Sequence, residues 1–143
     1  MIVITNPFFV EDEIDILDSL FEEGLSLLHI RKPEFSELEM AHFIPQIKPE
    51  YRNKLVLHSH HSLAEDFGIT RIHFSEKERK NNHNNPARFS KPCRYKYESI
   101  STSTHSIEGF NSLENDFNYA FLSPVFKSIS KENYHSEIDL FEE

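Results

Sequence analysis

Short apolar runs alternate along the chain with segments in which apolar residues recur every three or four positions. Runs of the first kind are typical of strands covered on both faces, and segments of the second kind are typical of helices that bury one face. Strands are predicted to start near residues 2, 25, 54, 70, 98 and 119, and helices to cover residues 11–23, 36–44, 62–67 and 106–113. This alternation predicts right-handed βαβ units and a parallel sheet.

Local signals mark the ends of these predicted helices. Ser36 with Glu39 three residues later is the capping-box pattern of a helix start. Gly24 stands where a glycine commonly ends a helix. The helix at residues 106–113 is expected to start at Ser106 and to turn an inner face of Ile107, Phe110 and Leu113 toward the sheet.

The charged and Asn-rich segment 76–96 breaks the pattern and is predicted to be a mobile surface loop. A nucleic-acid-binding tail is a weaker interpretation, because the chain carries a net charge of −9 and has a pI near 5.4. The same charge disfavours an anionic membrane surface, and no apolar run approaches the roughly 20 residues that span a bilayer. Cys93 is the single cysteine, so a cytoplasmic location is expected.

Two architectures fit six such strands, namely an open doubly wound sheet or a (β/α)8 barrel. The chain has three glycines, and no glycine-rich turn follows the first strand, so the dinucleotide-binding fingerprint is absent. The polar residues with useful chemistry follow the carboxyl ends of strands, a rule that both architectures share. We favour the barrel, as a single domain over residues 1–143 that stops after its sixth strand.

The stretch 118–131 combines a predicted strand with candidate ligand-binding chemistry. Tyr119–Leu122 is apolar, and the loop beyond it carries Ser128, Ser130 and Lys131. Two hydroxyls and an ammonium group suit an anionic, phosphorylated ligand. Arg31, at the end of the second strand, suits bidentate binding of a phosphate, although a plain surface role is the alternative.

Histidines follow or end four of the predicted strands. They are His29, His58, His73 and His105, and His60 and His61 are close to one of them. A zinc-type metal site is one interpretation. Since no H-x-x-x-H or C-x-x-C spacing supports it, we favour acid–base catalysis or hydrogen bonding to loop backbone. Glu76 and Glu78 are candidate Mg²⁺ ligands or parts of a solvated charge run.

Several of these segments resemble the thiamine phosphate synthase/TenI family of (β/α)8 barrels. S-P-V-F-K-S-I-S-K is similar to the family signature G-P-[IV]-[FY]-x-T-x-T-K, and S-T-S-T-H-S lies where the family has V-S-x-H-[ST]. L-H-I-R-K-P matches the strand-two motif Q-L-R-x-K in part. The segment from Leu63 to Phe74 follows the family stretch that ends in G-[VI]-H-[LV].

The resemblance implies roles for individual residues. Arg31 would contact a substrate diphosphate, and Ser128, Ser130 and Lys131 would form the diphosphate loop. Ser103 would bind substrate, Glu78 would be the second of two magnesium carboxylates, and His29 and His58 would occupy the substrate positions of a Gln and an Asn. Ser59 stands in place of the first magnesium carboxylate, and Pro33 in place of a Lys, with Lys32 one position earlier.

The implied activity is coupling of hydroxymethylpyrimidine diphosphate to thiazole phosphate with release of diphosphate, dependent on Mg²⁺. His105 and Lys131 are the candidate catalytic residues. The resemblance also allows a TenI-like thiazole tautomerase that uses His105, or an inactive phosphate-binding member. Family barrels have eight strands, so we expect a fragment or a chain completed by another subunit, which leaves homo-oligomerisation open. The expected partners are small phosphorylated molecules, neither nucleic acid nor membrane.

Overall fold

The computed structural model describes residues 1–82, 96–113 and 117–125. By its internal contacts the chain divides into two compact units. The first unit comprises Met1–His73 and Tyr95–Ser99, and the second comprises Phe74–Arg94 and Ile100–Glu143. No helix among the described residues is both long enough and apolar enough to cross a membrane.

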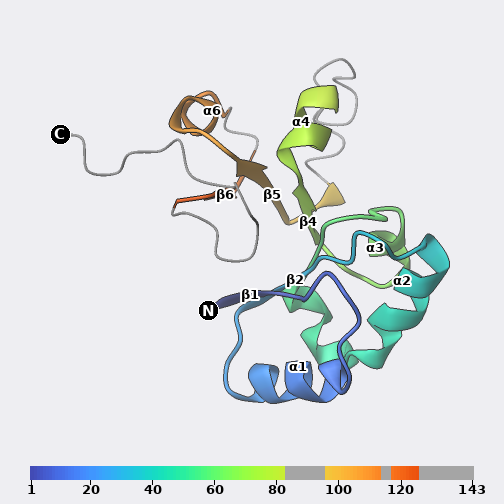
Figure 1. Cartoon of the computed structure of the whole chain (residues 1–143). Helices are drawn as coiled ribbons and strands as arrows, with labels where there is room; N and C mark the ends of the chain where they lie inside the picture. The colour runs from blue at the N-terminus through green and yellow to red at the C-terminus, as the bar shows by residue number, and fades with distance from the viewer. Residues whose placement is uncertain (83–95, 114–116, 126–143) are drawn as a thin grey trace. The chain divides into compact units, whose positions relative to one another are not determined.

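The order of elements follows the predicted alternation of strands and helices (Figure 1). The elements up to the end of the fourth strand are β1 (Ile2–Ile4), α1 (Glu13–Glu22), β2 (Leu27–Ile30), α2 (Glu37–Phe43), the 3₁₀ turns η1 (Ile44–Gln46) and η2 (Pro49–Lys54), β3 (Leu55–Leu57), α3 (Leu63–Asp66) and β4 (Arg71–Phe74). They are followed by α4 (Glu76–Asn82), β5 (Ser99–Thr104), α6 (Ile107–Asn111) and β6 (Tyr119–Leu122). Parallel pairing joins β1 to β2, β2 to β3 and β3 to β4, and in the second unit β5 to β6.

The register of the strands in the first unit sorts side chains onto two faces. Leu28 pairs with Leu55, and His29 pairs with Val56. Because side chains alternate along a strand, these two pairs lie on opposite faces. One face is wholly apolar and fully buried, and it consists of Leu28, Ile30, Leu55, Leu57 and Ile72. Helices α1 and α2 add Leu17, Phe21, Met40 and Phe43 to the apolar core.

The opposite face of the same strands is chemically different. It holds Val56 together with His29, His58 and His73. The pairing of Leu57 with Ile72 places His58 directly opposite His73 on the next strand. A sheet that is apolar on one face thus gathers three imidazoles on the other.

The predicted helix signals in the first unit are confirmed. The Ser36 hydroxyl accepts a hydrogen bond from the Glu39 backbone N–H, and the Glu39 carboxylate accepts one from the Ser36 N–H, which completes the capping box of α2. Gly24 follows α1 with φ of 91°, a left-handed conformation that favours glycine.

Lys32 is fully buried and anchors the end of β2 to the start of α1. Its Nζ lies 2.6 Å from a carboxylate oxygen of Glu13 and donates a hydrogen bond to the Phe8 carbonyl at 2.9 Å. The aromatic rings of Phe35 and Phe43 lie within 5.6 Å of the ammonium group. Lys32 is therefore committed to the interior and does not replace the ligand-binding Lys of the family motif.

In the second unit, the side chain of Asn118 fixes the pairing of β5 with β6. The backbone N–H of Asn118 donates to the Ile100 carbonyl at 2.8 Å, and the Ile100 N–H donates to the Asn118 Oδ1 at 2.9 Å. β6 is half-buried along its length, whereas its sequence predicted a buried strand.

The prediction of a loop over residues 76–96 is wrong in its first part, because residues 76–82 form α4. Ser75 and Glu78 make a capping box, with the Ser75 hydroxyl and backbone N–H both donating to the Glu78 carboxylate. Glu76 also forms an ion pair with Lys80 one turn later. These local contacts start a helix that has no apolar periodicity to predict it.

The prediction for the last helix is correct in its start and wrong in its buried face. Ser106 caps α6 by accepting a hydrogen bond from the Gly109 N–H. Ile107 is 42% exposed and Phe110 46% exposed, and α6 has no buried residue. Leu113, the third residue of the predicted face, is half-buried and lies beyond the end of the helix.

Replacement of Lys32 by Met tests the buried ion pair. It leaves the Glu13 carboxylate, which is 11% exposed, without its cation. We expect a loss of about 3–5 kcal/mol in the free energy of unfolding, measured by chemical denaturation, and a partial recovery in Lys32→Met/Glu13→Gln. The control is Lys96→Met, which removes an exposed pair with Glu65 and should change stability little. Equal losses in Lys32→Met and Lys96→Met would contradict a buried anchor.

Candidate functional site

Three histidines of the first unit meet on the polar face of β2, β3 and β4. His29 comes from the interior of β2, His58 follows β3, and His73 lies in β4. One ring nitrogen from each lies within 4.8 Å of the others, and Nδ1 of His29 is 2.8 Å from Nε2 of His58. The rings of His58 and His73 stack with centroids 4.1 Å apart. The sequence placed these residues at strand ends, but His29 is fully buried within its strand.

All three imidazoles are neutral at pH 7. Burial lowers the pKa of His29 to about 4, that of His73 to about 3 and that of His58 to about 2. The neighbouring imidazoles and the Arg31 guanidinium lower the pKa of His58 and His73 further. Neutral imidazoles can both donate and accept hydrogen bonds, and they are the form that binds metals.

A fourth histidine holds the backbone around this cluster. Nε2 of His61 lies 3.2 Å from the Leu57 carbonyl and 3.1 Å from the His73 carbonyl. Carbonyl oxygens only accept, so the Nε2–H of His61 donates to both and connects β3 to β4 beside the cluster. His60 is held differently, by a 2.7 Å contact to the Phe35 carbonyl.

Arg31 is exposed where β2 ends. Its backbone N–H donates to the hydroxyl of Thr5 at 2.9 Å, and its carbonyl accepts from that hydroxyl at 3.2 Å. The backbone of Arg31 is thus fixed to the loop after β1. Its guanidinium carries a positive charge that acts on His58 and His73 and lowers the pKa of both.

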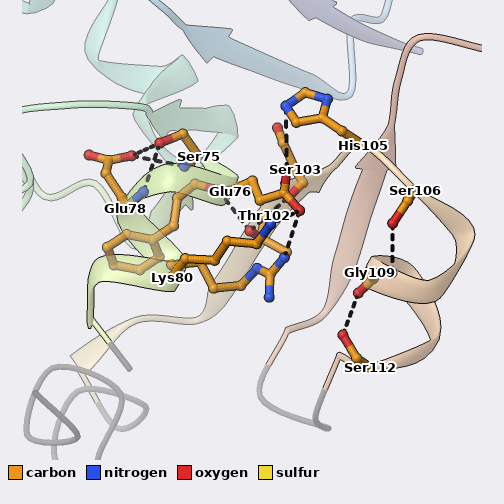
Figure 2. A network of polar contacts seen from close by, with 12 residues as sticks. Ser75, Glu76, Glu78, Lys80, Thr102, Ser103, His105, Ser106, Gly109 and Ser112 are labelled. Atoms are coloured by element: carbon orange, nitrogen blue, oxygen red, sulfur yellow. Dashed lines mark hydrogen bonds and ion pairs between the residues drawn. The ribbon is translucent and has the colours of Figure 1, made fainter. Parts of the chain in front are cut away.

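The second unit has its own polar cluster, in which Glu76 is the centre (Figure 2). Nδ1 of His105 lies 2.6 Å from the Ser123 carbonyl, so Nδ1 carries the hydrogen and Nε2 is the basic nitrogen of the neutral ring. Nε2 lies 3.8 Å from Oε2 of Glu76, while Oε1 of Glu76 is 3.1 Å from Nζ of Lys80. Glu76, Lys77, Lys80, Asn81 and His105 line a pocket of about 340 Å³.

Magnesium needs hard oxygen ligands, which the described residues supply only in part. Oε2 of Glu78 accepts hydrogen bonds from the backbone N–H and the hydroxyl of Ser75, but Oε1 of Glu78 makes no hydrogen bond or ion pair with another described residue. At the position of the other family carboxylate, Ser59 has a buried hydroxyl without a hydrogen-bond partner in the described part of the chain. Glu78 could hold one coordination position, with the remainder left to substrate oxygens.

The remaining predicted site residues fall in two groups. Ser103 lies near the carboxyl end of β5, half-buried and paired in register with Phe121 of β6. Ser128, Ser130 and Lys131 lie outside the described residues, as does Cys93. The direct pairing of His58 with His73 was not predicted. Counting from the predicted strand starts at residues 54 and 70 places His58 at the fifth position and His73 at the fourth, which would put them on opposite faces. The register that brings them together, with Leu57 opposite Ile72, depends on tertiary packing.

The family model described as thiamine monophosphate synthase matches residues 1–142. The chain belongs to the thiamine monophosphate synthase family. It is also similar to the crystal structure of thiamine phosphate pyrophosphorylase from Bacteroides thetaiotaomicron, with 33% sequence identity and a TM-score of 0.70. The similarity covers 87% of this chain and 58% of that one, so the chain spans little more than half the length of its structural relative. No curated protein matches the chain.

Membership of the thiamine monophosphate synthase family confirms the predicted fold class. The fold is α/β of the (β/α)8 type, and the described residues contain six of its parallel strands. The most conspicuous features of this member are the neutral histidine cluster and the serine at position 59.

The depressed pKa values predict a stability that depends on pH. Above about pH 6.5, the pKa of histidine in an unfolded chain, the cluster is neutral in both states and its contribution is fully present. As the pH falls below 6.5, His29 and His73 are protonated in the unfolded chain but stay neutral in the folded protein. The free energy of unfolding therefore decreases with falling pH, until the pH reaches the folded pKa values near 4 and 3.

We expect each of these two histidines to remove about 1–2 kcal/mol of stability between pH 7 and pH 5. Denaturant titrations of the wild type and of His29→Gln/His73→Gln, over pH 5 to 8, measure the difference. His42→Gln, on the surface of α2, is the control. Parallel pH profiles of the wild type and the double variant would show that the cluster is not the source.

Proposed function

We propose that this protein is a thiamine phosphate synthase-like transferase. It would couple hydroxymethylpyrimidine diphosphate to thiazole phosphate and release diphosphate. The observation that carries the proposal is the family match over residues 1–142, which includes every position discussed above. The name of the structural relative, thiamine phosphate pyrophosphorylase, describes the same reaction class.

In this reaction the bond between the pyrimidine methylene carbon and the diphosphate oxygen breaks. The ring nitrogen of the thiazole forms a new bond to that carbon, and diphosphate leaves with the electron pair. Negative charge therefore grows on the diphosphate oxygens as the bond breaks. Fixed cations and hydrogen-bond donors at those oxygens lower the barrier more than they stabilise the substrate.

Of the described residues, Arg31 is best suited to stabilise the negative charge that grows on the diphosphate. Its backbone is fixed by Thr5, and its guanidinium can donate two parallel hydrogen bonds to a phosphate group. Lys131 would add a second cation, and Ser128 and Ser130 would add hydroxyl donors, as the sequence predicts. Ser103 would bind substrate from β5.

His29 and His58 suit contacts with the pyrimidine. Both are neutral, and because Nδ1 of His29 pairs with Nε2 of His58, each would contact the aromatic amine or its ring nitrogen through its other ring nitrogen. At the corresponding positions the family motifs have side-chain amides, which also pair one donor with one acceptor. The change thus keeps the hydrogen-bonding character while replacing a flexible amide with a rigid ring.

Magnesium is part of the proposal as an ion carried mainly by the diphosphate, with Glu78 as its protein ligand. When bound, it would neutralise charge on the leaving group. We place the activity in the cytoplasm, with small phosphorylated molecules as partners and neither nucleic acid nor membrane involved. Association of identical chains is compatible with this assignment and is tested by size-exclusion chromatography.

A coupled assay tests the transferase. Purified protein, Mg²⁺ and both substrates should yield thiamine phosphate, detected by chromatography. Arg31→Ala and Lys131→Ala should each lower kcat/KM by about 10²–10³, because each removes charge stabilisation from the leaving group. Lys48→Ala removes a cation that pairs with Asp18 and Glu22, outside the candidate site, and should leave the rate unchanged. Absence of product from the wild type, with phosphate ligands still bound, would favour an inactive member.

The geometry of His105 favours one alternative, a thiazole tautomerase. The Ser123 carbonyl holds Nδ1–H, which leaves Nε2 as the base, and Lys77 and Lys80 line the same pocket. A tautomerase would move one proton from carbon to carbon of the thiazole carboxylate phosphate. The lysines would attract the anionic substrate, and the Glu76 carboxylate, 3.8 Å from Nε2, would orient the ring of His105.

Exchange of the thiazole tautomers, followed by NMR, tests this alternative. His105→Ala should lower the rate by about 10²–10⁴ as a general base is lost. Glu76→Gln should lower it less and shift its pH profile, since Glu76 acts through His105. Lys131→Ala separates the two activities: it should reduce thiamine phosphate formation and leave tautomerisation intact. A tautomerisation rate that is unchanged in His105→Ala would exclude His105 as the base.

A further inference from the structure

We propose that His29, His58 and His73 form a binding site for one divalent transition-metal ion of the zinc type. This site goes beyond the proposed transferase, from which it takes over His29 and His58, and it differs from the family's magnesium site in ligand chemistry. Magnesium takes carboxylate, phosphate and water oxygens, whereas imidazole nitrogen suits zinc, cobalt, nickel and copper.

The strand register is the first support. His29 lies in β2, His58 directly follows β3 and His73 lies in β4, so three consecutive strands each bring one imidazole to one face. Ligands placed on strands are held more precisely than ligands on loops. Of the described residues, these three are the set of His, Cys, Asp or Glu side chains whose ligand atoms come together closely enough to hold an ion.

The distances are the second support. A tetrahedral zinc ion with metal–nitrogen bonds of about 2.0–2.1 Å separates its ligand nitrogens by about 3.3 Å. The nitrogens of His29 and His58 are 2.8 Å apart, and all three lie within 4.8 Å of one another. Ring centroids are 5.1 Å apart for His29 and His58, and 5.5 Å for His29 and His73. Binding of the ion would therefore require the stacked rings of His58 and His73 to rotate so that a nitrogen of each points at the metal.

The protonation state is the third support. Metal binding requires neutral imidazole, and protons normally compete with the metal near neutral pH. Here burial keeps the pKa of each ring at about 4 or below, so protons do not compete at pH 7. The His61 imidazole fixes the carbonyls of Leu57 and His73, which holds the backbones of two ligand strands in register.

The donor set also indicates what kind of site this would be. Three histidines with one open position are the ligands of catalytic zinc centres, where water fills the fourth position. His58 is half-buried, so the cluster is accessible from the carboxyl end of β3. The Arg31 guanidinium acts electrostatically on His58, and its positive charge favours an anionic oxygen ligand at that fourth position.

Cobalt binding to the protein freed of metal by a chelator tests the site without any substrate. We expect one Co²⁺ per chain, with the intense visible absorption of four-coordinate cobalt, and displacement of Co²⁺ by Zn²⁺. The thermal midpoint should rise with Zn²⁺ concentration because the ion binds the folded chain. Binding that does not saturate at one equivalent of Co²⁺, or the weak absorption of octahedral cobalt, would overturn the proposal.

Two variants and a control make the test residue-specific. His58→Asn and His73→Gln should each weaken Co²⁺ binding by at least about 100-fold, since each removes one of three ligands. His42→Gln, on the exposed face of α2, should bind as the wild type does. Equal affinity in His58→Asn and the wild type would overturn the site even if some metal is bound.

A negative result for the metal site can be distinguished from a negative result for the proposed transferase activity. The metal measurements use Co²⁺ and Zn²⁺ alone, whereas the transferase assay follows product and depends on Arg31 and Lys131. If the variants do not fold, the stoichiometry and absorption spectrum of the wild type still decide, because a protein without the site gives neither.

Discussion

The parallel register of β2, β3 and β4 is the constraint on which the rest of the first unit depends. Because side chains alternate along each strand, one choice of register turns Leu28 and Leu55 toward the helices and His29 and His58 to the other face. A slip by one residue would turn the imidazoles toward the apolar core that α1 and α2 complete, where polar groups without hydrogen-bond partners cost free energy. The register that avoids this cost also assembles the histidine cluster.

Much of the fold was predictable because it depends on local signals. The Ser36 and Glu39 capping box, the glycine after α1 and the positions of all six strands follow from short-range pattern. The failures have physical causes of two kinds. Helix α4 begins through side-chain to backbone hydrogen bonds of Ser75 and Glu78 and has no apolar stripe. The exposure of Ile107 and Phe110 could not be foreseen, because periodicity tells which residues share a helix face and not what covers it.

The candidate sites were predictable in residue type and less so in grouping. His29, His58 and His105 were identified from strand ends and family motifs. Which side chains lie next to each of them depends on strand register and burial, which the sequence pattern does not give. Lys32 shows the difference most clearly. In sequence it stands next to a family phosphate-binding position, but its ammonium group is enclosed by Glu13, Phe8 and two aromatic rings. One position along the chain decides between a ligand contact and an interior anchor.

The hydrogen bonds of His61 have a consequence for the tautomer of its ring. The carbonyls of Leu57 and His73 only accept hydrogen bonds, so the ring must keep a hydrogen on Nε2 to bind them. One N–H group is thus shared between the end of β3 and β4. A side chain without a donor at position 61 would take that hydrogen bond from both strands at once.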